Sequence, residues 1–504
     1  MSAMEGQKVV VVGAGPVGAL AGLYAAARDC HVEIYELRSD LRDPSTVPLN
    51  FTKSINLALS ERGINSMRNS GCPGLIDSVL ADTIPMHGRM IHGEQSGELF
   101  EESQAYDAHG RFIRAADRGG LNKRLLDRLE AMPNVKFFFN HKLTGVDFKK
   151  KLAWFERRAY SHDDDQKNSR EIEISFDFMI GADGAHSTAR YNLMKYTRMF
   201  YQQEYIDTLW CEFHMEPKKT AQGDDFKLSP NHLHIWPGGK FMFIAIPSLD
   251  KSFTCTLFLP AARFAELDAA PSSVVPFFQV NFPGVVPDLI PAAELQAQYL
   301  ANPHLPLITI KCAPYHFEGT GVVLGDAAHA MVPFYGQGMN AGLEDVRVLF
   351  DILDGHAGVG SATLPRADAR AAALAEYSAR RARDAFAIND LALRNYKEMR
   401  ADVVSPVYRL RKRVEEALSV HVPSLGWATQ YSRISFGNLP YAEVERLAQK
   451  QGKVLKVGFG VVVAMLGGVV GWWGWRLVRR GMLKAAMDRL SELAMRASQR
   501  LGEG

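Results

Sequence analysis

Cysteine is scarce in this chain of 504 residues and shows no paired spacing. No Cys-x-x-Cys motif occurs, and the cysteines lie far apart, at Cys30, Cys72, Cys211, Cys255 and Cys312. We therefore expect reduced thiols in a reducing compartment. The pattern also excludes flavoenzymes that pass electrons through a pair of neighbouring thiols.

A strong charge of either sign is lacking as well. The formal net charge is +2, with 23% charged and 47% hydrophobic residues. These values are ordinary for a globular protein and give no reason to expect nucleic acid as a partner. The length favours two or three domains.

Clusters of metal ligands are missing too. His232 and His234 alternate along an expected strand, but no acid or cysteine with ligand spacing stands beside them. Histidines two residues apart on a strand are common without a metal. We therefore expect no metal site.

Residues 9–27 are apolar enough to resemble the core of a signal peptide. The glycines favour a different interpretation, because residues 13–18 read G-x-G-x-x-G between an expected strand, 8–12, and an expected helix that begins at Val17. In such a motif Gly13 permits a tight turn, Gly15 lets a pyrophosphate approach, and Gly18 lets the helix pack on the sheet. The pattern predicts a dinucleotide site.

A second expected strand, residues 32–36, ends in Glu36. A carboxylate at this position accepts hydrogen bonds from an adenosine ribose and repels a 2′-phosphate. The unit therefore predicts a site for the ADP half of FAD or NAD, and not for NADP.

A second glycine-rich block, residues 325–340, lies between an apolar run, 322–324, and an expected helix, 341–353. Asp326 at the carboxyl end of a strand suits the hydroxyls of a ribityl chain. Gly338, Met339 and Asn340 place backbone N–H groups at a helix N-terminus, which favours the negative charge of a reduced flavin. Together with the N-terminal unit, this block predicts FAD.

Two further segments favour FAD. Asp183 lies in a glycine-lined turn that follows an expected strand, 176–180, and precedes Thr188. Arg118 stands just before an amphipathic helix start and suits a phosphate, although such an arginine alone is more often a solvated surface charge. Three distant segments are expected where one extended cofactor is held at both ends.

The middle of the chain, residues 205–305, has short alternating strands. We expect strands at 209–215, 233–236, 241–246 and 253–259, with a hairpin turn at 237–240. They predict an antiparallel sheet that covers the flavin ring. Ile244 and Ile246 share one face, as do Thr254, Thr256 and Phe258.

In this order, the glycine fingerprint, Asp183-Gly184 and Gly325-Asp326 resemble the single-component flavoprotein aromatic hydroxylases. Within that family the similarity is greatest to members that hydroxylate kynurenine. Further stretches that carry it are 54–60, 84–86, 89–92, 233–237, 251–258, 395–396 and 398–400. The resemblance covers roughly residues 5–440.

The resemblance implies an α/β fold with a Rossmann-type FAD-binding domain of the glutathione-reductase kind, an antiparallel β-sheet substrate domain, a C-terminal helical region and a transmembrane helix. We expect the FAD-binding domain at 5–75, 107–200 and 306–356, and the substrate domain at 76–106 and 201–305. The helical region would span 357–452, the anchor 457–478 and an amphipathic tail 481–501.

The resemblance also implies the site residues. Arg89, Tyr106 and Asn395 would bind a substrate carboxylate, and the aromatic ring would contact Ile244, Ile246, Phe258, Phe334 and Met399. The implied FAD contacts are Gly13, Gly15, Val17, Gly18, Glu36, Leu37, Arg38, Ala58, Arg118, Leu143, Asp183, Thr188, Asp326, Gly338, Met339 and Asn340. A further substrate-contacting tyrosine of the family has no clear match near residues 426–431.

The implied activity uses NADPH to reduce FAD and O2 to hydroxylate L-kynurenine beside its aniline nitrogen, giving 3-hydroxykynurenine. Because the amine already enriches the ring in electrons, we expect no catalytic base. The NADPH-binding residues stay unpredicted, and a homodimer is possible. The alternative is a membrane-anchored FAD monooxygenase of a lipid or quinone, but such a substrate has no use for a carboxylate clamp.

Residues 457–475 form a run of 19 residues without a charge. As a helix it would span about 28 Å, close to the hydrocarbon thickness of a membrane. Tryptophans at its end and arginines just beyond, Trp472, Trp473, Trp475, Arg476, Arg479 and Arg480, fit a membrane interface. A buried helix of the globular part is the competing interpretation. An anchor late in the chain predicts a cytosolic catalytic part, and the resemblance implies the mitochondrial outer membrane.

Overall fold

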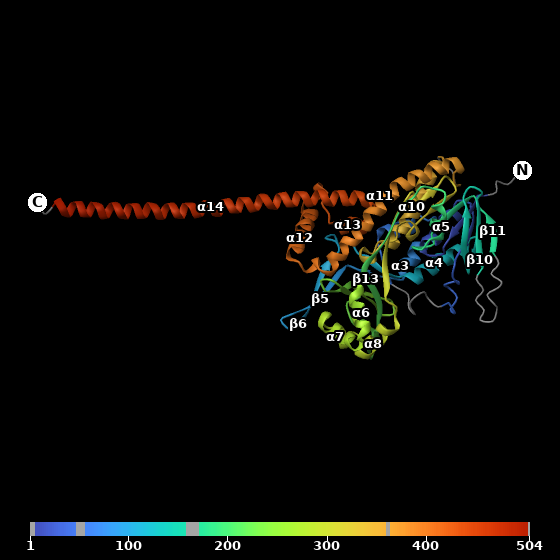
Figure 1. Cartoon of the computed structure of the whole chain (residues 1–504), viewed down its shortest axis with the longest axis horizontal. Helices are drawn as coiled ribbons and strands as arrows, with labels where there is room; N and C mark the ends of the chain where they lie inside the picture. Colours follow the sequence, from blue (N-terminus) through green and yellow to red (C-terminus); the bar gives the residue numbers. More distant parts are fainter. Residues whose placement is uncertain (1–5, 47–55, 158–170, 359–362, 502–504) are drawn as a thin grey trace. The chain divides into compact units, whose positions relative to one another are not determined.

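The computed structural model describes residues 6–46, 56–157, 171–358 and 363–501 (Figure 1). Ser54 and Ile55 of the family-like stretches lie outside these ranges. The chain forms two units, Met1–Glu445 and Arg446–Gly504, and each is described by itself.

A six-stranded sheet forms the first layer of the larger unit. Its order is β20 (His316–Phe317), β21 (Gly321–Val323), β12 (Phe178–Gly181), β1 (Lys8–Val12), β2 (His31–Tyr35) and β8 (Val135–Phe138). All neighbours are parallel except β20 and β21. β1 is a run of buried valines, as expected for a strand covered on both faces.

Helix α1 (Pro16–Ala26) follows β1 and packs against α4 (Arg118–Glu130) and α10 (Gly338–Ala357). This confirms the predicted order of strand, glycine loop, helix and strand at the N-terminus. A separate three-stranded sheet consists of β9 (His141–Asp147), β10 (Leu152–Arg157) and β11 (Glu171–Ser175).

A seven-stranded sheet forms the second layer. Its order is β19 (Leu305–Ala313), β13 (Phe200–Met215), β18 (Phe253–Leu259), β17 (Met242–Pro247), β16 (His232–Pro237), β5 (Gly88–Gln95) and β6 (Glu98–Ala105). β5 runs parallel to β16, so the sheet is not antiparallel throughout as expected from the sequence. The reason is that β5 comes from a distant part of the chain, and no hairpin joins it to β16.

Helices α6 (Ala261–Ala269), α7 (Val274–Asn281) and α8 (Ala292–Ala301) gather beside β13 (Figure 1). Their apolar residues form one buried cluster with Cys211, Phe213, Cys255 and Leu257 of the sheet. Because side chains alternate along a strand, the neighbouring residues of β13 and β18 point to the opposite face. That face carries the predicted substrate contacts.

A three-stranded sheet links the two layers. It contains β3 (Asn56–Leu59), β7 (Ile113–Asp117) and β4 (Thr83–Met86). The remaining main helices of this unit are α2 (Glu61–Arg68), α3 (Leu75–Ala81), α5 (Thr188–Leu193), α9 (Asp326–His329), α11 (Ala367–Arg400), α12 (Pro406–His421) and α13 (Gln430–Ser435).

The second unit is part of helix α14 (Tyr441–Leu501). It contains the uncharged run 457–475. This is the single helix of the described residues that is long and apolar enough to cross a membrane. Its length and composition are compatible with a membrane anchor.

Candidate functional site

The glycine loop between β1 and α1 has the shape that a pyrophosphate needs. Gly13 has φ of +101°, and a Cβ atom there would lie 2.5 Å from the carbonyl oxygen of Ala182. A Cβ atom on Gly18 would collide with the carbonyl oxygen of Gly13, whereas nothing lies within 4 Å of the Cβ position of Gly15. The space beside Gly15 therefore fits a group that approaches the backbone closely.

Glu36 follows β2 and binds the glycine loop directly. Its carboxylate accepts hydrogen bonds from the N–H of Ala14 at 2.7 Å and of Arg38 at 3.0 Å. Leu37 and Arg38 are exposed beside it. A carboxylate has about four acceptor positions, so two remain for a ribose. The arrangement fits the predicted adenosine site.

Asn340 joins the second glycine-rich block to β3. Its Oδ1 accepts the N–H of Ser60 at 2.9 Å, and its Nδ2 donates to the carbonyls of Ala58 and Gly336, each at 2.8 Å. The structure thus brings Ala58 together with the loop that holds Gly338 and Met339. The side chain of Asn340 holds this loop in place, which leaves the loop's backbone for a ligand.

Asp326 is exposed at the start of α9, and its carboxylate has no hydrogen bond or ion pair among the described residues. Gly325 before it has φ of +57° and donates its N–H to Asp345 at 2.8 Å. Val17 packs closely against Gly325. The carboxylate of Asp326 is therefore free to accept hydroxyl groups.

Other predicted FAD contacts are less direct in the structure. The carboxylate of Asp183 accepts hydrogen bonds from the hydroxyl of Ser187 at 2.5 Å and the N–H of Ala189 at 3.0 Å, beside Thr188 at the start of α5. Arg118 is exposed at the start of α4, and Leu143 of β9 is buried in the hydrophobic core. Their roles toward a cofactor stay predictions.

Arg89 of β5 and Tyr106 meet as predicted for a carboxylate clamp. The guanidinium carbon of Arg89 lies 5.8 Å from the centre of the Tyr106 ring. Nε of Arg89 and the hydroxyl of Tyr106 are buried without a hydrogen-bond partner among the described residues. Burial holds the pKa of Tyr106 well above its usual value, so its hydroxyl stays protonated. Two unpaired buried donors at one place fit an anionic ligand.

Glu398 of α11 is the ion-pair partner of Arg89, at 2.9 Å from its Nη1, and also accepts the hydroxyl of Tyr408 at 2.8 Å. Burial opposes the charge of Arg89, but Glu398 holds the pKa of the guanidinium above its usual value. Arg89 therefore stays charged. Neither Glu398 nor Tyr408 was singled out from the sequence as part of this site.

Tyr431 of α13 is the main residue that sequence reasoning missed. Its ring stacks on Tyr106 with centroids 4.8 Å apart and on Tyr335 at 5.7 Å, and the guanidinium of Arg89 lies 5.0 Å from its centre. The sequence left the family's further tyrosine contact unassigned at residues 426–431, and a role of Tyr431 toward a substrate stays a prediction. The signal was present, because Tyr431 is the one tyrosine in the stretch 424–431.

The predicted ring contacts form an apolar wall. Ile244, Phe258, Phe334 and Met399 belong to one buried cluster, and the rings of Phe258 and Phe334 lie 4.9 Å apart. Ile246 packs in the neighbouring cluster with Tyr106 and Tyr431.

Asn395 joins this wall through its Nδ2, which donates to the carbonyl of Phe334 at 2.7 Å. Its amide therefore orients the loop at Phe334. Six of the eight predicted substrate residues thus lie in two hydrophobic clusters, and Arg89 and Asn395 contact members of them. Their roles toward a substrate stay predictions.

Glu212 of β13 shares this face of the sheet. It is directly paired with Thr256, which is paired with Ile244, and paired side chains point the same way. Glu212 is buried, and its Oε2 lacks a hydrogen bond among the described residues. Burial raises the pKa of this carboxyl to about 8, so it is neutral at pH 7.

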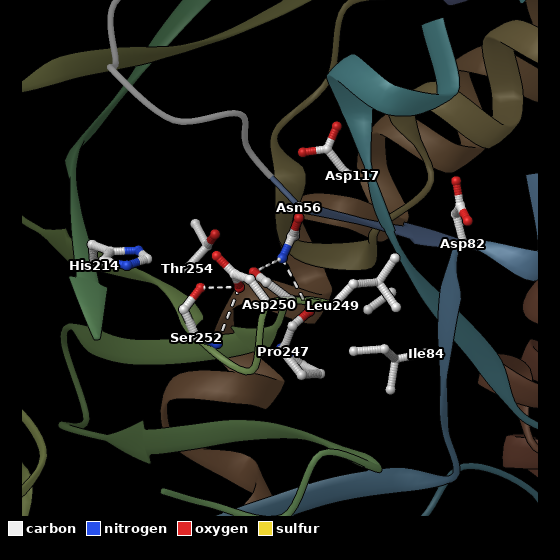
Figure 2. A pocket seen from close by; sticks show the side chains of 12 residues that line it. Asn56, Asp82, Ile84, Asp117, His214, Pro247, Leu249, Asp250, Ser252 and Thr254 are labelled. Atoms are coloured by element: carbon white, nitrogen blue, oxygen red, sulfur yellow. Dashed lines mark hydrogen bonds between the residues drawn. The ribbon is translucent and has the colours of Figure 1, made fainter. Parts of the chain in front are cut away.

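A cavity of about 400 Å³ lies where the sheet of β3, β7 and β4 meets β17 and β18 (Figure 2). Asn56 closes one side by donating to the carbonyl of Pro247 at 3.0 Å and to the hydroxyl of Ser248 at 2.6 Å. Three carboxylates line it, those of Asp82, Asp117 and Asp250. Asp117 directly precedes Arg118, so the cavity borders a predicted flavin contact.

The histidines of β16, His232 and His234, form hydrogen bonds within the protein. His234 bonds to His92 at 2.7 Å and to the carbonyl of Ser229 at 2.8 Å, and His232 bonds to the hydroxyls of Ser103 and Ser229. Burial lowers the pKa of His92 to about 3 and of His234 to about 4. Both are neutral at pH 7. Over residues 6–46, 56–157, 171–358 and 363–501, no group of three potential ligands is placed to hold a metal ion.

Comparison with known proteins agrees with this geometry. The model of the FAD binding domain family matches residues 7–392. Kynurenine 3-monooxygenase of Neurospora crassa is 64% identical over 478 residues, which is 93% of each chain. The same enzyme of Chaetomium globosum is 65% identical over 470 residues, covering 92% of this chain and 98% of that one.

Solved structures of lower identity share the fold. A tetrameric form of 2-methyl-3-hydroxypyridine-5-carboxylic acid oxygenase matches with a TM-score of 0.59 at 17% identity, covering 85% of this chain and 99% of that one. p-Nitrophenol 4-monooxygenase from Pseudomonas putida gives the same TM-score and identity, covering 88% and 98%. With relatives above 60% identity over most of its length, the chain belongs to the kynurenine 3-monooxygenase family of FAD-dependent enzymes.

Proposed function

We propose that the protein hydroxylates L-kynurenine at C3 to give 3-hydroxykynurenine, with FAD as the bound cofactor, NADPH as reductant and O2 as the oxygen source. One oxygen atom enters the ring, the other leaves as water, and NADPH becomes NADP⁺. The observation that carries this proposal is the pair of unpaired buried donors, Arg89 Nε and the hydroxyl of Tyr106, beside an apolar wall.

Kynurenine is an amino acid with an aniline ring, and the two halves of the site suit its two ends. Its carboxylate would accept hydrogen bonds from Arg89 and Tyr106, which supplies the partners that these donors lack. Tyr431 stacks on Tyr106 and keeps its ring in place. Glu398 keeps Arg89 charged and fixes its orientation through Nη1.

The ring of kynurenine would lie against Ile244, Ile246, Phe258, Phe334 and Met399. These side chains are buried or half-buried and exclude water from the reacting carbon. Bound FAD supplies the reduction and the activation of oxygen. The chain's own task is to bind and orient the substrate, and no catalytic base is assigned.

A monooxygenase of a lipid or quinone is the less favoured function. A substrate without a negative charge would leave the buried Arg89 Nε and the Tyr106 hydroxyl unpaired, at a cost of roughly 1–3 kcal/mol for each unsatisfied group. The curated relatives are also named for kynurenine and not for a lipid.

The proposed reaction is tested by mixing the purified holoenzyme with NADPH and ¹⁸O2, with and without kynurenine. We expect the flavin absorbance to bleach and one labelled oxygen atom to appear in the kynurenine product. Oxidation of NADPH without any labelled product would contradict the substrate assignment.

We further propose that residues 457–475 anchor the protein in the mitochondrial outer membrane, with the catalytic part in the cytosol. The uncharged run and the flanking tryptophans and arginines support this. A chain ended near Gly452 should appear in the soluble fraction with FAD bound. Retention of that shorter chain on carbonate-washed membranes would contradict the anchor.

A further inference from the structure

Helix α12 carries its apolar residues on the outside. Val407, Leu410 and Val414 are 78%, 57% and 37% exposed. Their spacing of three and four residues places them on one face of the helix. In a helix of a soluble domain such a stripe normally faces the core.

The opposite face of α12 is polar and is fixed to the protein. The hydroxyl of Tyr408 donates to Glu398 at 2.8 Å, Nζ of Lys412 donates to the carbonyl of Ala105 at 2.7 Å, and the hydroxyl of Ser419 bonds to His109 at 3.1 Å. The apolar face cannot turn inward unless these bonds break. Its exposure is therefore a property of the fold.

Further apolar residues are exposed near the end of the helix. They are Val420 in its last turn and Val422 and Leu425 in the segment that follows. An exposed apolar stripe bordered by polar residues marks a site of contact with a partner or a membrane.

Basic side chains border the apolar face. Arg411 is half-exposed and pairs with Glu415 at 2.9 Å on the same helix, while Arg413 is exposed and has no ion pair within the described residues. An apolar face between arginines is typical of a helix that lies in the headgroup region of an anionic membrane. A second copy of this face fits less well, because it offers apolar residues and arginines but no complementary negative charge.

We propose that the outer face of α12, together with residues 420–425, docks on the surface of an anionic membrane. The proposal rests on the membrane anchor proposed above, which would keep the catalytic unit near a bilayer. Because the inner face of the same helix bonds to Glu398 and Ala105, the docked helix would also cover the substrate site beside Arg89 and Tyr106.

The test uses the full chain with FAD, reconstituted into vesicles of phosphatidylcholine and phosphatidylserine. A spin label is placed at Leu410→Cys in a Cys72→Ser background, since the other four cysteines are buried. The matched control is a label at Val280→Cys, which is 80% exposed on α7. Flavin absorbance confirms that each variant is folded.

We expect the vesicles to float with the protein, and the label at position 410 to lie about 5–10 Å into the boundary between headgroups and acyl chains. There it should be accessible to oxygen and shielded from a water-soluble nickel chelate, while the label at position 280 stays accessible to nickel. A floating protein with both labels equally accessible to nickel overturns the docking of α12 and leaves the anchor intact.

Two other results also overturn the proposal. Protein that does not float refutes both the anchor and the docking. A label at position 410 that is shielded from nickel and oxygen alike, with magnetic coupling between labels in detergent, shows that a second copy covers the face.

Discussion

Two regions of the larger unit bury arginines, and they differ in how fully these arginines are paired. Arg62 and Arg381 are 0% and 2% exposed and share Glu344, at 2.8 and 2.9 Å. Arg381 also pairs with Asp345 at 2.5 Å, and Asp345 with His329 at 2.6 Å. Both arginines also donate hydrogen bonds to backbone carbonyls, and the guanidinium of Arg62 lies over the ring of Tyr441.

Arg89 is buried to a similar extent, yet it has one carboxylate partner and an Nε without a hydrogen bond in the described parts of the chain. Tyrosine rings form the rest of its surroundings. A buried group without partners is costly unless a ligand supplies them. The paired arginines therefore stabilise the fold, whereas we propose that Arg89 binds a ligand.

Breaking the network around Arg62 and Arg381 should have the largest effect. In Asp345→Ala, Arg381 and His329 lose a buried partner and the N–H of Gly325 loses its acceptor. We expect the free energy of unfolding to fall by roughly 3–5 kcal/mol, measured by urea denaturation. In the control, Arg380→Ala, an exposed pair with Glu376 is lost, and the fall should be below about 1 kcal/mol. Equal effects would contradict the distinction.

Glu212 offers a buried carboxyl with no cationic partner. Its pKa is about 8 in the fold, above the usual 4.5, so the folded protein binds the extra proton between these values. Stability should therefore fall as the pH rises from about 4.5 to about 8, by on the order of 4 kcal/mol. Glu212→Gln should remove most of this fall, measured as Tm at pH 5.5 and 8.5. A variant with the same pH dependence as the wild type would show that Glu212 is charged in the fold.

Removing Arg89, whose Nε lacks a partner among the described residues, should affect the substrate more than the cofactor. A charge-assisted hydrogen bond contributes roughly 1.5–3 kcal/mol, so Arg89→Ala should lower kcat/KM for kynurenine by about 10- to 150-fold. Arg89→Lys keeps the charge but loses the planar fork and should fall between. FAD content should stay unchanged. With an analogue that lacks the carboxylate the loss should nearly vanish, and an equal loss would mean that Arg89 is structural.

Asp326 extends the comparison to a carboxylate that is exposed and unpaired. If it holds ribityl hydroxyls, Asp326→Ala should weaken FAD binding by roughly 1–3 kcal/mol. The purified variant should lose yellow colour on dialysis while its urea midpoint without FAD stays at the wild-type value. Full occupancy at wild-type affinity would remove Asp326 from the site.

The flavin-binding half was predictable because its contacts depend on backbone geometry within short segments of the sequence. Gly13, Gly15 and Gly18 lie within six residues, and their spacing alone fixes the turn, the open cradle and the close packing that the structure shows. The strands and helices around them have strong periodic patterns. Two features of the second sheet were not predicted. β5 runs parallel to β16, and no local turn joins these two strands. β19 belongs to this sheet, although residues 306–356 were expected in the FAD-binding domain.

The sequence by itself determined the order of strand, loop and helix, the cofactor type and the apolar C-terminal run, because each depends on consecutive residues. Only the tertiary structure decided that Tyr431 stacks on Tyr106 and Tyr335 and that Glu398 forms an ion pair with Arg89. It also decided that the apolar stripe of α12 faces outward. These features depend on contacts between segments hundreds of residues apart and on burial. Neither is encoded in local spacing, so the sequence pattern of one segment cannot reveal them.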